Sequence, residues 1–472
     1  MAVIATEYLD MLKEYWIKNG VQNLIRINSR VLPKFDTLRV VGKVQKIAVG
    51  AGFGGAISGN YTKALDNIAS QGEVKAFAYE PGRMFSLYSV SVPEIAAAKN
   101  YDGATMKVEG YKHFVSTDRL RKALSIALYG RGYGELAVIG STDALSTAAD
   151  TTYTIPFNAR MAISVGTKLA LKATVSGAEA ATMTVKAIGQ ANGTNSVSIT
   201  VRGDAAYTPA ATDILCFAGA VANDANNTPR FPVGLGGILP VVGQRTGSDW
   251  TTSIGTSFYG INRSTDVDAY AGQYVKQASG DSKINTLKTA LRVANAAGSK
   301  ADLIILNDFD WESLSKEIET SSLYYTDTRA SGKRDAHVGY NSISVNFYNQ
   351  IVERVVPDAF CPKGTFYVID TDTIKFLSYL NANVKEATEG MQDAPGKVMN
   401  MEDGAGESRA TDPYSILIDD WLSAEPSHND DGAIAVIAMN VLATWGCLNP
   451  SVNLVGKFTS VAADENLVEE KV

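Results

Sequence analysis

The sequence has little of the side-chain chemistry on which metal and redox sites depend. Its 472 residues include only 3 cysteines and 3 histidines. They lie far apart in the chain: Cys216, Cys361, Cys447, His113, His337 and His428. None has a second such residue at the short spacing of a zinc or iron site, and no disulfide framework is visible. We therefore expect no bound metal, and the cysteine usage fits a reducing cytoplasm.

The sequence also lacks a long apolar run and an excess of basic residues. Glu7, Asp10 and Glu14 interrupt the region where a signal peptide would be apolar throughout. The most apolar stretch, 433–445, contains Asn440 and is too short to span a bilayer. With 43 Lys and Arg against 50 Asp and Glu, the net charge is −7, which gives no support for groove-reading DNA recognition. We expect a soluble protein made inside the cell, without membrane contact.

Catalytic motifs are missing as well. The sequence contains no phosphate-binding P-loop, no nucleophile elbow and no metalloprotease helix. Asp302, Asp308 and Asp310 flank a predicted strand-to-helix turn, where helix capping accounts for them. The acidic pairs 370/372 and 419/420 and the acidic turn 430–432 are typical of solvated surface and are weak evidence for a cation site. We expect no catalytic residues, no cofactor and no enzymatic activity.

One glycine-rich segment offers a contrasting interpretation, a nucleotide-dependent enzyme. Residues 50–55, Gly-Ala-Gly-Phe-Gly-Gly, match a dinucleotide-binding turn and follow a strand-like run over 44–49. Such a turn holds a pyrophosphate only if a helix N-terminus follows it. Ser58, Gly59 and Asn60 instead favour a turn, and no helix with a periodic apolar face begins in time. The match is therefore weak evidence for a nucleotide site.

The strongest helix signal covers residues 116–129. Ser116 and Thr117 are typical helix caps, and Asp118 suits the positive end of a helix. One face then carries apolar residues at helical spacing: Leu120, Ala123, Leu124 and Ala127. Three glycines within 130–134 end the pattern, because glycine adopts left-handed conformations at little cost. We therefore expect one long, stiff helix, the rod, which ends at these glycines.

Two segments before this rod cannot form a core of their own. Residues 6–19 predict an amphipathic helix with an apolar stripe of Tyr8, Leu9, Leu12, Tyr15 and Trp16. Residues 43–92 predict a hairpin of two extended arms, joined by a polar, glycine-rich middle and kinked at 81–82. An exposed aromatic stripe and a weakly hydrophobic hairpin both need a partner, in this chain or in a neighbouring one.

After the rod the composition and the apolar pattern of the sequence change twice. Residues 141–223 are poor in charge, and strand-like runs over 151–155, 168–175, 180–187 and 196–201 predict a small all-β insert, a barrel or a sandwich. The residues after the insert again predict both helices and strands. The helices begin after 283 and 307, and the strands cover 301–306, 342–348, 352–356, 366–369, 433–442 and 452–458. Residues 385–412 predict a surface loop, and 464–470 a loose acidic tail.

The order of these elements resembles the major capsid protein of tailed bacteriophages, whose Hong Kong-type fold encapsulin shells share. Several stretches carry the likeness: the rod and its exit at 128–135, the turn at 234–240, the connector at 259–264, the strand at 301–307, and 355–362 leading into 366–370. The resemblance implies an α+β fold with six parts. They are an N-terminal arm (1–42), an extended loop hairpin (43–95), a peripheral domain with the spine helix (96–140), an all-β insertion domain (141–225), an axial domain with returning peripheral strands (226–450), and a C-terminal strand with an acidic tail (451–472).

The resemblance also implies a function. The chain would self-assemble through pentamers and hexamers into an icosahedral head and enclose double-stranded DNA, touching its phosphates weakly and non-specifically. It would lie in the virion capsid after synthesis in the bacterial host cytoplasm. Scaffolding, portal and decoration proteins are possible partners, and an encapsulin-like compartment is the alternative within the fold. The candidate inter-subunit contacts are Tyr8, Leu12, Trp16, Phe77, Tyr79, Phe85 and Tyr88.

Two features of assembly follow less directly from the resemblance. Some relatives cross-link a loop lysine to an asparagine of another subunit, and the loop here offers four lysines, none of which the sequence selects: Lys43, Lys46, Lys63 and Lys75. The sequence has no charged, helical N-terminal extension of the scaffold type. We therefore expect assembly to depend on a separate scaffold or on the insert.

Overall fold

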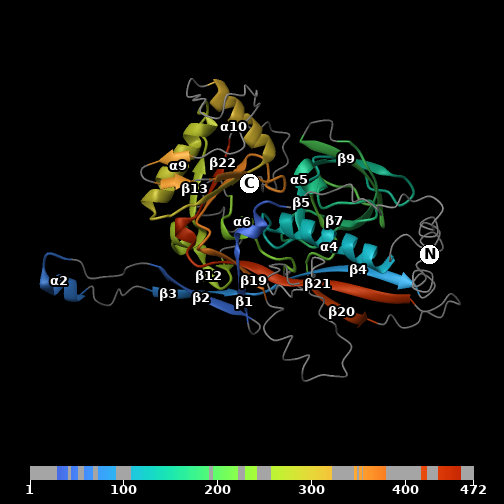
Figure 1. The fold of residues 1–472 in the computed structure, drawn as a ribbon, viewed down its shortest axis with the longest axis horizontal. Coiled ribbons are helices and arrows are strands. Elements are labelled where there is room, and N and C mark those ends of the chain that lie inside the picture. The colour runs from blue at the N-terminus through green and yellow to red at the C-terminus, as the bar shows by residue number, and fades with distance from the viewer. Residues whose placement is uncertain are drawn as a thin grey trace, which may run out of the picture.

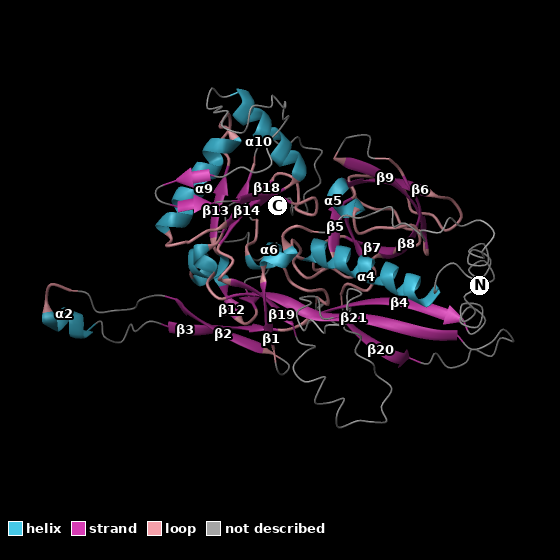
Figure 2. Ribbon diagram, in the orientation of Figure 1, coloured by secondary structure: helices cyan, strands magenta, loops and turns pink. Residues whose placement is uncertain are grey.

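The computed structural model describes residues 29–40, 44–51, 58–66, 73–91, 108–190, 195–221, 229–241, 257–320, 345–347, 350–352, 354–378, 416–422 and 434–458. The predictions for the helix at 6–19, the loop at 385–412 and the tail at 464–470 lie outside these residues. The described part combines helices and strands in three regions around one long helix, and a thin arm extends away from them (Figures 1 and 2).

A long sheet forms the base of the molecule in Figure 1, and the long helix lies along it. Its strands are β1 (Asp36–Arg39), β19 (Ile374–Ser378), β21 (Ile434–Cys447), β20 (Ile416–Leu422) and β4 (Gly82–Ser91). β21 pairs with β4 from Ile434 to Ala443 and then with β19 as far as Cys447. The strand predicted at 433–442 is therefore present but longer, because its C-terminal half is buried through Trp445 and Cys447.

The long helix α4 (Val108–Ala127) begins before the predicted caps. Ser116 and Asp118 lie inside it, so their interpretation as its N-terminal residues was wrong. Their polar groups are satisfied within the helix and by a neighbouring strand: Ser116 Oγ lies 2.5 Å from Ser86 Oγ of β4, and Asp118 pairs with Lys122 one turn later at 2.5 Å. Cap-type side chains are tolerated inside a helix when such partners exist.

The predicted hairpin is present only in part. β2 (Gln45–Ala51) and β3 (Glu73–Tyr79) pair antiparallel, with Gln45 opposite Tyr79 and Ala51 opposite Glu73. The second predicted arm then divides at residues 80–81, because β4 leaves the hairpin and pairs with β21. Pro81 has no N–H to donate to a ladder, which is consistent with a break at this point.

The insert is a six-stranded antiparallel sheet in the order β5-β10-β7-β8-β9-β6. Its strands are β5 (Glu135–Val138), β10 (Ile214–Phe217), β7 (Lys168–Lys172), β8 (Ala181–Ile188), β9 (Ser196–Gly203) and β6 (Thr151–Pro156), with the short helix α5 (Phe157–Arg160) after β6. All four predicted strands are present. Sequence patterns missed the two four-residue strands, β5 and β10, and β5 lies before the predicted insert boundary at 141.

The third region is a mixed sheet covered by two helices. Its strands follow the order β13 (Gln273–Lys276), β22 (Leu454–Lys457), β18 (Thr365–Ile369), β14 (Leu303–Leu306) and β17 (Arg354–Pro357). The helices are α9 (Lys283–Ala296) and α10 (Asp308–Thr320). Ser282 caps α9 by accepting from Asn285 N at 3.1 Å, and Asn307 caps α10 by accepting from Phe309 N at 2.9 Å. The periodic patterns predicted both helices.

Short elements connect these regions. They are η1 (Leu32–Lys34), α2 (Tyr61–Asp66), α6 (Leu235–Ile238), β11 (Ser257–Phe258), β12 (Ile261–Asn262), η2 (Arg263–Thr265), α8 (Val267–Ala271), β15 (Val345–Phe347), β16 (Gln350–Val352) and η3 (Pro450–Val452). One continuous core joins the end of α4, the insert strands, the long sheet and one face of β14 and β18.

Candidate assembly surfaces

The extended arm is fastened to the body at its base by an aromatic cluster. Phe77 and Tyr79 of β3 are both 0% exposed. The Phe77 ring packs edge-on against Phe258 and Tyr270, with centroids 6.0 and 6.3 Å apart. Tyr79 Oη donates to Cys447 O at 3.3 Å and accepts from Cys447 N at 3.1 Å, and burial raises its pKa. These two predicted contact residues therefore belong to the chain's own core and present no surface to a neighbour.

The far end of the same arm exposes its apolar side chains instead of burying them. Helix α2 lies there, away from the body (Figure 1), and begins after Asn60, whose Oδ1 accepts from Thr62 N at 3.0 Å. Tyr61 is 80% exposed and Leu65 50% exposed, one turn apart on one helix face. Val74 on β3 is 73% exposed. A six-residue helix is marginal by itself, so this tip has an apolar face that its own chain does not cover.

The geometry of the arm does not suit the nucleotide interpretation of residues 50–55. A dinucleotide-binding turn joins two parallel strands through a helix. Here β2 and β3, the strands on either side of the glycines, are antiparallel partners in one hairpin. The intervening helix has only six residues. Residues 52–57 lie outside the described residues, and the described strands on either side of them do not have the parallel arrangement that such a turn joins.

The long sheet has a second exposed apolar surface on β4. Met84 is buried and Ser86 bonds to α4, so the alternate side chains point to the other face of the sheet. Phe85 and Leu87 on that face are 57% and 58% exposed. Phe85 is thus the one predicted contact residue whose described side chain is open to solvent. Tyr88 lies on β4, but its side chain, like the whole of Tyr8, Leu12 and Trp16, lies outside the described residues.

Two glycine-rich stretches that carried the resemblance form one joint at the end of α4. The carbonyls of Leu128 and Gly130 accept from Leu235 N at 2.5 Å and from Gly234 N at 3.1 Å. A methyl group at Gly234 would overlap Leu128 O, and one at Gly236 would overlap Tyr129 O. The turn at 234–240 therefore closes the unsatisfied C-terminal end of the long helix with its own N–H groups, and only glycine permits this approach.

A buried arginine joins the third resembling stretch, 259–264, to the same turn. Arg263 is 0% exposed and donates to Gly237 O at 2.8 Å and to Ile238 O at 3.2 Å. Its guanidinium lies 3.5 Å from the centre of the Phe258 ring. Sequence patterns did not identify Arg263, because an arginine in a connector is usually solvated.

The acidic residues that the sequence assigned to capping have different roles. Asp310 is 0% exposed, pairs with Lys283 Nζ at 2.8 Å and accepts from Gly364 N at 2.6 Å, so it fastens α10 to the start of α9. Asp302 accepts from Thr371 N at 2.9 Å and from Thr371 Oγ1 at 2.6 Å. Burial raises the pKa of Asp308. Capping accounts for none of these contacts, and the helix cap is Asn307.

A fully enclosed carboxyl group that the sequence did not single out lies beside this cluster. Asp358 is 2% exposed and accepts from Ser29 Oγ at 2.7 Å, from Tyr129 Oη at 2.8 Å and from Phe360 N at 3.1 Å. Burial raises its pKa, while these three donors and Arg30 oppose that shift. Asp358 thus joins the first described segment, the end of α4 and the turn after β17.

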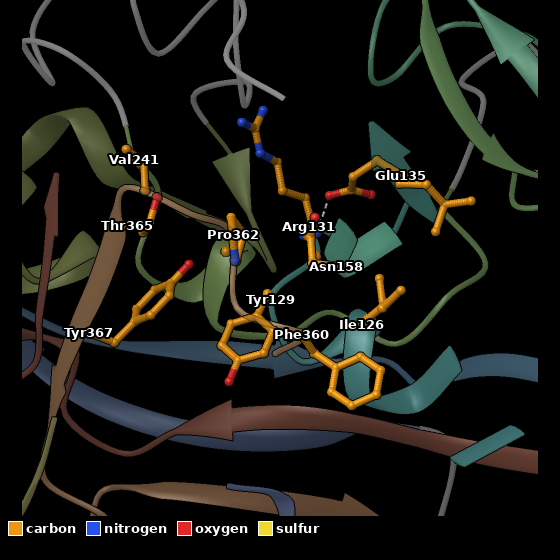
Figure 3. Close-up of a pocket in the computed structure, with 13 residues that line it drawn as sticks. Ile126, Tyr129, Arg131, Glu135, Asn158, Val241, Phe360, Pro362, Thr365 and Tyr367 are labelled. Carbon is orange, nitrogen blue, oxygen red and sulfur yellow. Dashed lines mark hydrogen bonds between the residues drawn. The ribbon is translucent and has the colours of Figure 1, made fainter. Parts of the chain in front are cut away.

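A cavity of about 90 Å³ lies where α4, the insert and the mixed sheet meet (Figure 3). Apolar and polar side chains share its lining: Ile126, Tyr129, Arg131, Glu135, Leu136, Asn158, Val241, Phe360, Pro362, Thr365 and Tyr367. Glu135 accepts from Arg131 N at 2.5 Å and from Tyr133 N at 3.2 Å, so its carboxylate closes the glycine turn.

The described residues contain neither a cluster of metal ligands nor a membrane-spanning helix. Among them, no group of three or more His, Cys, Asp or Glu side chains is placed to hold a metal ion. No described helix has the length and apolar character needed to cross a bilayer.

Comparison with solved structures finds capsid and encapsulin folds. The chain is similar to a chain of the cyanophage A-1(L) capsid asymmetric unit, with 13% identity, a TM-score of 0.51 and coverage of 95% of this chain and 97% of that one. Two weaker likenesses have TM-scores of 0.42: the capsid of a native GTA particle (9% identity, 97% and 98% covered) and the holo-SrpI encapsulin complex from Synechococcus elongatus PCC 7942 (8% identity, 96% and 94% covered).

Sequence searches alone find nothing comparable, since no protein-family model and no curated protein matches the chain. The likeness to the cyanophage capsid chain extends over nearly the whole of both chains. It confirms the α+β fold expected from the order of elements: this chain has the Hong Kong-type fold of phage capsid proteins.

Proposed function

We propose that this chain is the major capsid protein of a tailed bacteriophage and builds the shell of the head from pentamers and hexamers. The observation that carries the proposal is the extended arm. Its base is locked into the body by Phe77 and Tyr79, while Tyr61 and Leu65 at its far end are 80% and 50% exposed. An arm of this kind is stable only when another surface covers its tip, and in a homo-oligomeric shell that surface belongs to the next subunit.

The proposal extends to the content and the partners of the shell. The shell would enclose double-stranded DNA, which its inner surface would touch through weak, salt-sensitive contacts to phosphate. A net charge of −7 suits such weak contacts. Scaffolding, portal and decoration proteins would act with it in the virion, after synthesis in the host cytoplasm. No catalytic step is part of this function.

Electron microscopy of the purified chain, combined with its mass by light scattering, tests the proposal. We expect closed shells of uniform size, or discrete pentamers and hexamers. The matched control is the double substitution Tyr61→Asp and Leu65→Asp, which should leave only unassembled subunits. A chain that stays monomeric or dimeric in every buffer, and also in extract of infected cells where a separate scaffold would be present, would contradict self-assembly.

The content of particles isolated from infected cells separates the two shell functions. Nuclease-protected double-stranded DNA supports a phage head. Protected protein cargo without DNA supports an encapsulin-like compartment instead.

A further inference from the structure

The turn between β11 and β12 holds a tyrosine in a backbone conformation that tyrosine rarely adopts. Tyr259 has a φ of 47°, and Gly260 after it has a φ of 88°. Among the described residues, Tyr259 is the only one besides glycines with a positive φ. Asparagine and glycine usually fill such positions in two-residue turns, because their backbones reach the left-handed region at lower cost. A strained residue persists only where its surroundings hold it, so the contacts of Tyr259 indicate what this turn does.

These contacts are with the base of the extended arm, beside which β12 lies (Figure 1). The carbonyl oxygen of Tyr259 accepts from Ala78 N of β3 at 3.0 Å. The ring of Tyr259 lies 4.8 Å from the ring of Tyr79, centre to centre. The neighbouring ring of Phe258 lies 6.0 Å from that of Phe77. One backbone bond and two ring pairs therefore hold this hairpin against β3.

The same hairpin is tied to the end of α4 by Arg263, the residue that follows β12. The fully buried guanidinium lies 3.5 Å from the centre of the Phe258 ring and donates to Gly237 O and Ile238 O at 2.8 and 3.2 Å. Both carbonyls belong to the turn at 234–240, whose N–H groups bond to the last carbonyls of the long helix. A buried cation is stable only where acceptors replace its water. Arg263 therefore fixes the hairpin relative to this turn.

We propose that residues 257–263 form a clamp that sets the direction of the extended arm relative to the end of α4, with Tyr259 and Arg263 as its positioning residues. Tyr259 fixes the clamp to β3, and Arg263 fixes it to the turn that closes α4. The clamp is a property of the single chain. Its consequence for assembly rests on the proposed function, because regular shells form only if every arm leaves its subunit in a defined direction.

Hydrogen–deuterium exchange of the full chain, measured on unassembled subunits isolated by size-exclusion chromatography, tests both ends of the clamp. The amides of β3 report on the arm, and those of 234–239 report on the turn. Arg263→Met keeps much of the side chain's length but removes its charge and its donors. It should raise exchange at both places by about tenfold or more, the factor expected for the loss of hydrogen bonds to a charged group. The insert strand β9 is the internal reference and should exchange as in the wild type.

A second position keeps the test decisive if Arg263→Met folds poorly. Tyr259→Asn suits the left-handed backbone, so the turn should persist while its ring contact with Tyr79 is lost. Exchange of β3 should rise about threefold or more, as expected for the loss of an aromatic pair, while that of 234–239 stays unchanged. Tyr259→Phe keeps the ring and is the matched control, so its β3 exchange should equal that of the wild type.

Lys283→Met controls for the loss of a buried cation. Lys283 is 5% exposed and pairs with Asp310 on the helices that cover the mixed sheet. This variant should leave exchange of β3 and of 234–239 unchanged, even if it lowers the melting temperature as much as Arg263→Met does.

The outcomes separate the clamp from general destabilisation. Unchanged β3 exchange in Arg263→Met and Tyr259→Asn would overturn the clamp, as would an equal rise in β9 or in Lys283→Met. A rise at only one end in Arg263→Met would overturn its role as the link to α4.

Electron microscopy of assembled material tests the consequence for the shell. Tyr259→Asn should give fewer or less regular shells than Tyr259→Phe, and equal shells from the two variants would overturn that consequence. If β3 exchange rises as expected but the wild type forms no shell, the proposed function fails and the clamp stands.

Discussion

Two β-structured parts, the insert and the extended arm, project from the body of this subunit, and they differ in how much of their apolar surface they bury. The insert encloses apolar side chains from most of its strands, and Leu171, Met183 and Ile199 are 0% exposed. The extended arm has only two strands and leaves Val74 and Tyr61 73% and 80% exposed. A single hairpin is at best marginally stable in water, whereas a larger sheet with a covered face is stable on its own. The insert therefore completes its core within the chain, while the arm needs another surface.

The largest expected effect is on assembly and concerns the arm's tip. Tyr61→Asp combined with Leu65→Asp should abolish assembly, because charge would replace the uncovered apolar face of α2. The melting temperature of the isolated subunit should stay within a degree or two, since neither side chain is in its core, and surface changes cost about 0.5 kcal/mol or less. Light scattering and calorimetry measure the two quantities.

Lys63→Asp is the matched control for charge at this tip, because it changes the charge by as much as the double variant and Lys63 is exposed on the opposite face of the same helix. It should assemble. If the double variant forms normal shells, the arm does not act through this face, and the contrast with the insert loses its functional meaning.

One apolar strand residue in the insert and one in the arm, each replaced by alanine, test the contrast in stability. Leu171→Ala should lower the free energy of unfolding by about 2–5 kcal/mol, because it opens a cavity in the insert. Val74→Ala in the arm should change it by about 0.5 kcal/mol at most. Denaturant unfolding followed by fluorescence gives both values. Equal losses would mean that the arm has a core of its own.

A pair of glycines compares the arm with the turn at 234–240 through the backbone. Gly236→Ala places a methyl group against Tyr129 O at the end of α4, and we expect a loss of about 1–3 kcal/mol or more. Gly50→Ala in the arm meets no atom within 4 Å and should be neutral or slightly stabilising. Thermal unfolding distinguishes them. If Gly236→Ala does not lower the melting temperature, the turn at 234–240 can move away from α4.

The smallest loss of stability is expected for a substitution where the insert contacts α10. Phe157 of α5 packs edge-on against Phe309, with ring centroids 6.3 Å apart. Phe157→Leu keeps an apolar side chain but removes the ring pair, which should cost about 0.5–1.5 kcal/mol. Val165→Ala, at a site 59% exposed in the insert, is the control and should be silent. If Phe157→Leu does not change the free energy of unfolding, the contact between the insert and α10 does not contribute to stability.

Local patterns predicted the regular elements of the fold well. Apolar spacing predicted α9 and α10, and alternation predicted β6, β7, β8 and β9. The same rules missed the four-residue strands β5 and β10, because so short a run has no measurable period. They also placed the start of α4 at Ser116, since a serine capable of capping looks the same in sequence when it bonds across to Ser86.

The candidate site was predicted less well than the fold. The hairpin pattern drew attention to Phe77, Tyr79 and Phe85, but it did not show which of them were buried. Alternation along a strand separates two faces, and it does not say what covers each face. Tyr79 is covered by Tyr259, at a ring distance of 4.8 Å, from a connector far along the chain.

The sequence by itself determined the class of this protein: a chain with few cysteines and histidines, no catalytic motif, one long helix with a glycine stop, a charge-poor β insert and an arm without a core. These properties depend on composition and on spacing within about ten residues. The tertiary structure alone decided the partners of Asp358, Asp310 and Arg263. Their hydrogen bonds join segments that are distant in sequence, and a buried charged side chain is defined by those distant donors and acceptors rather than by its neighbours in the chain.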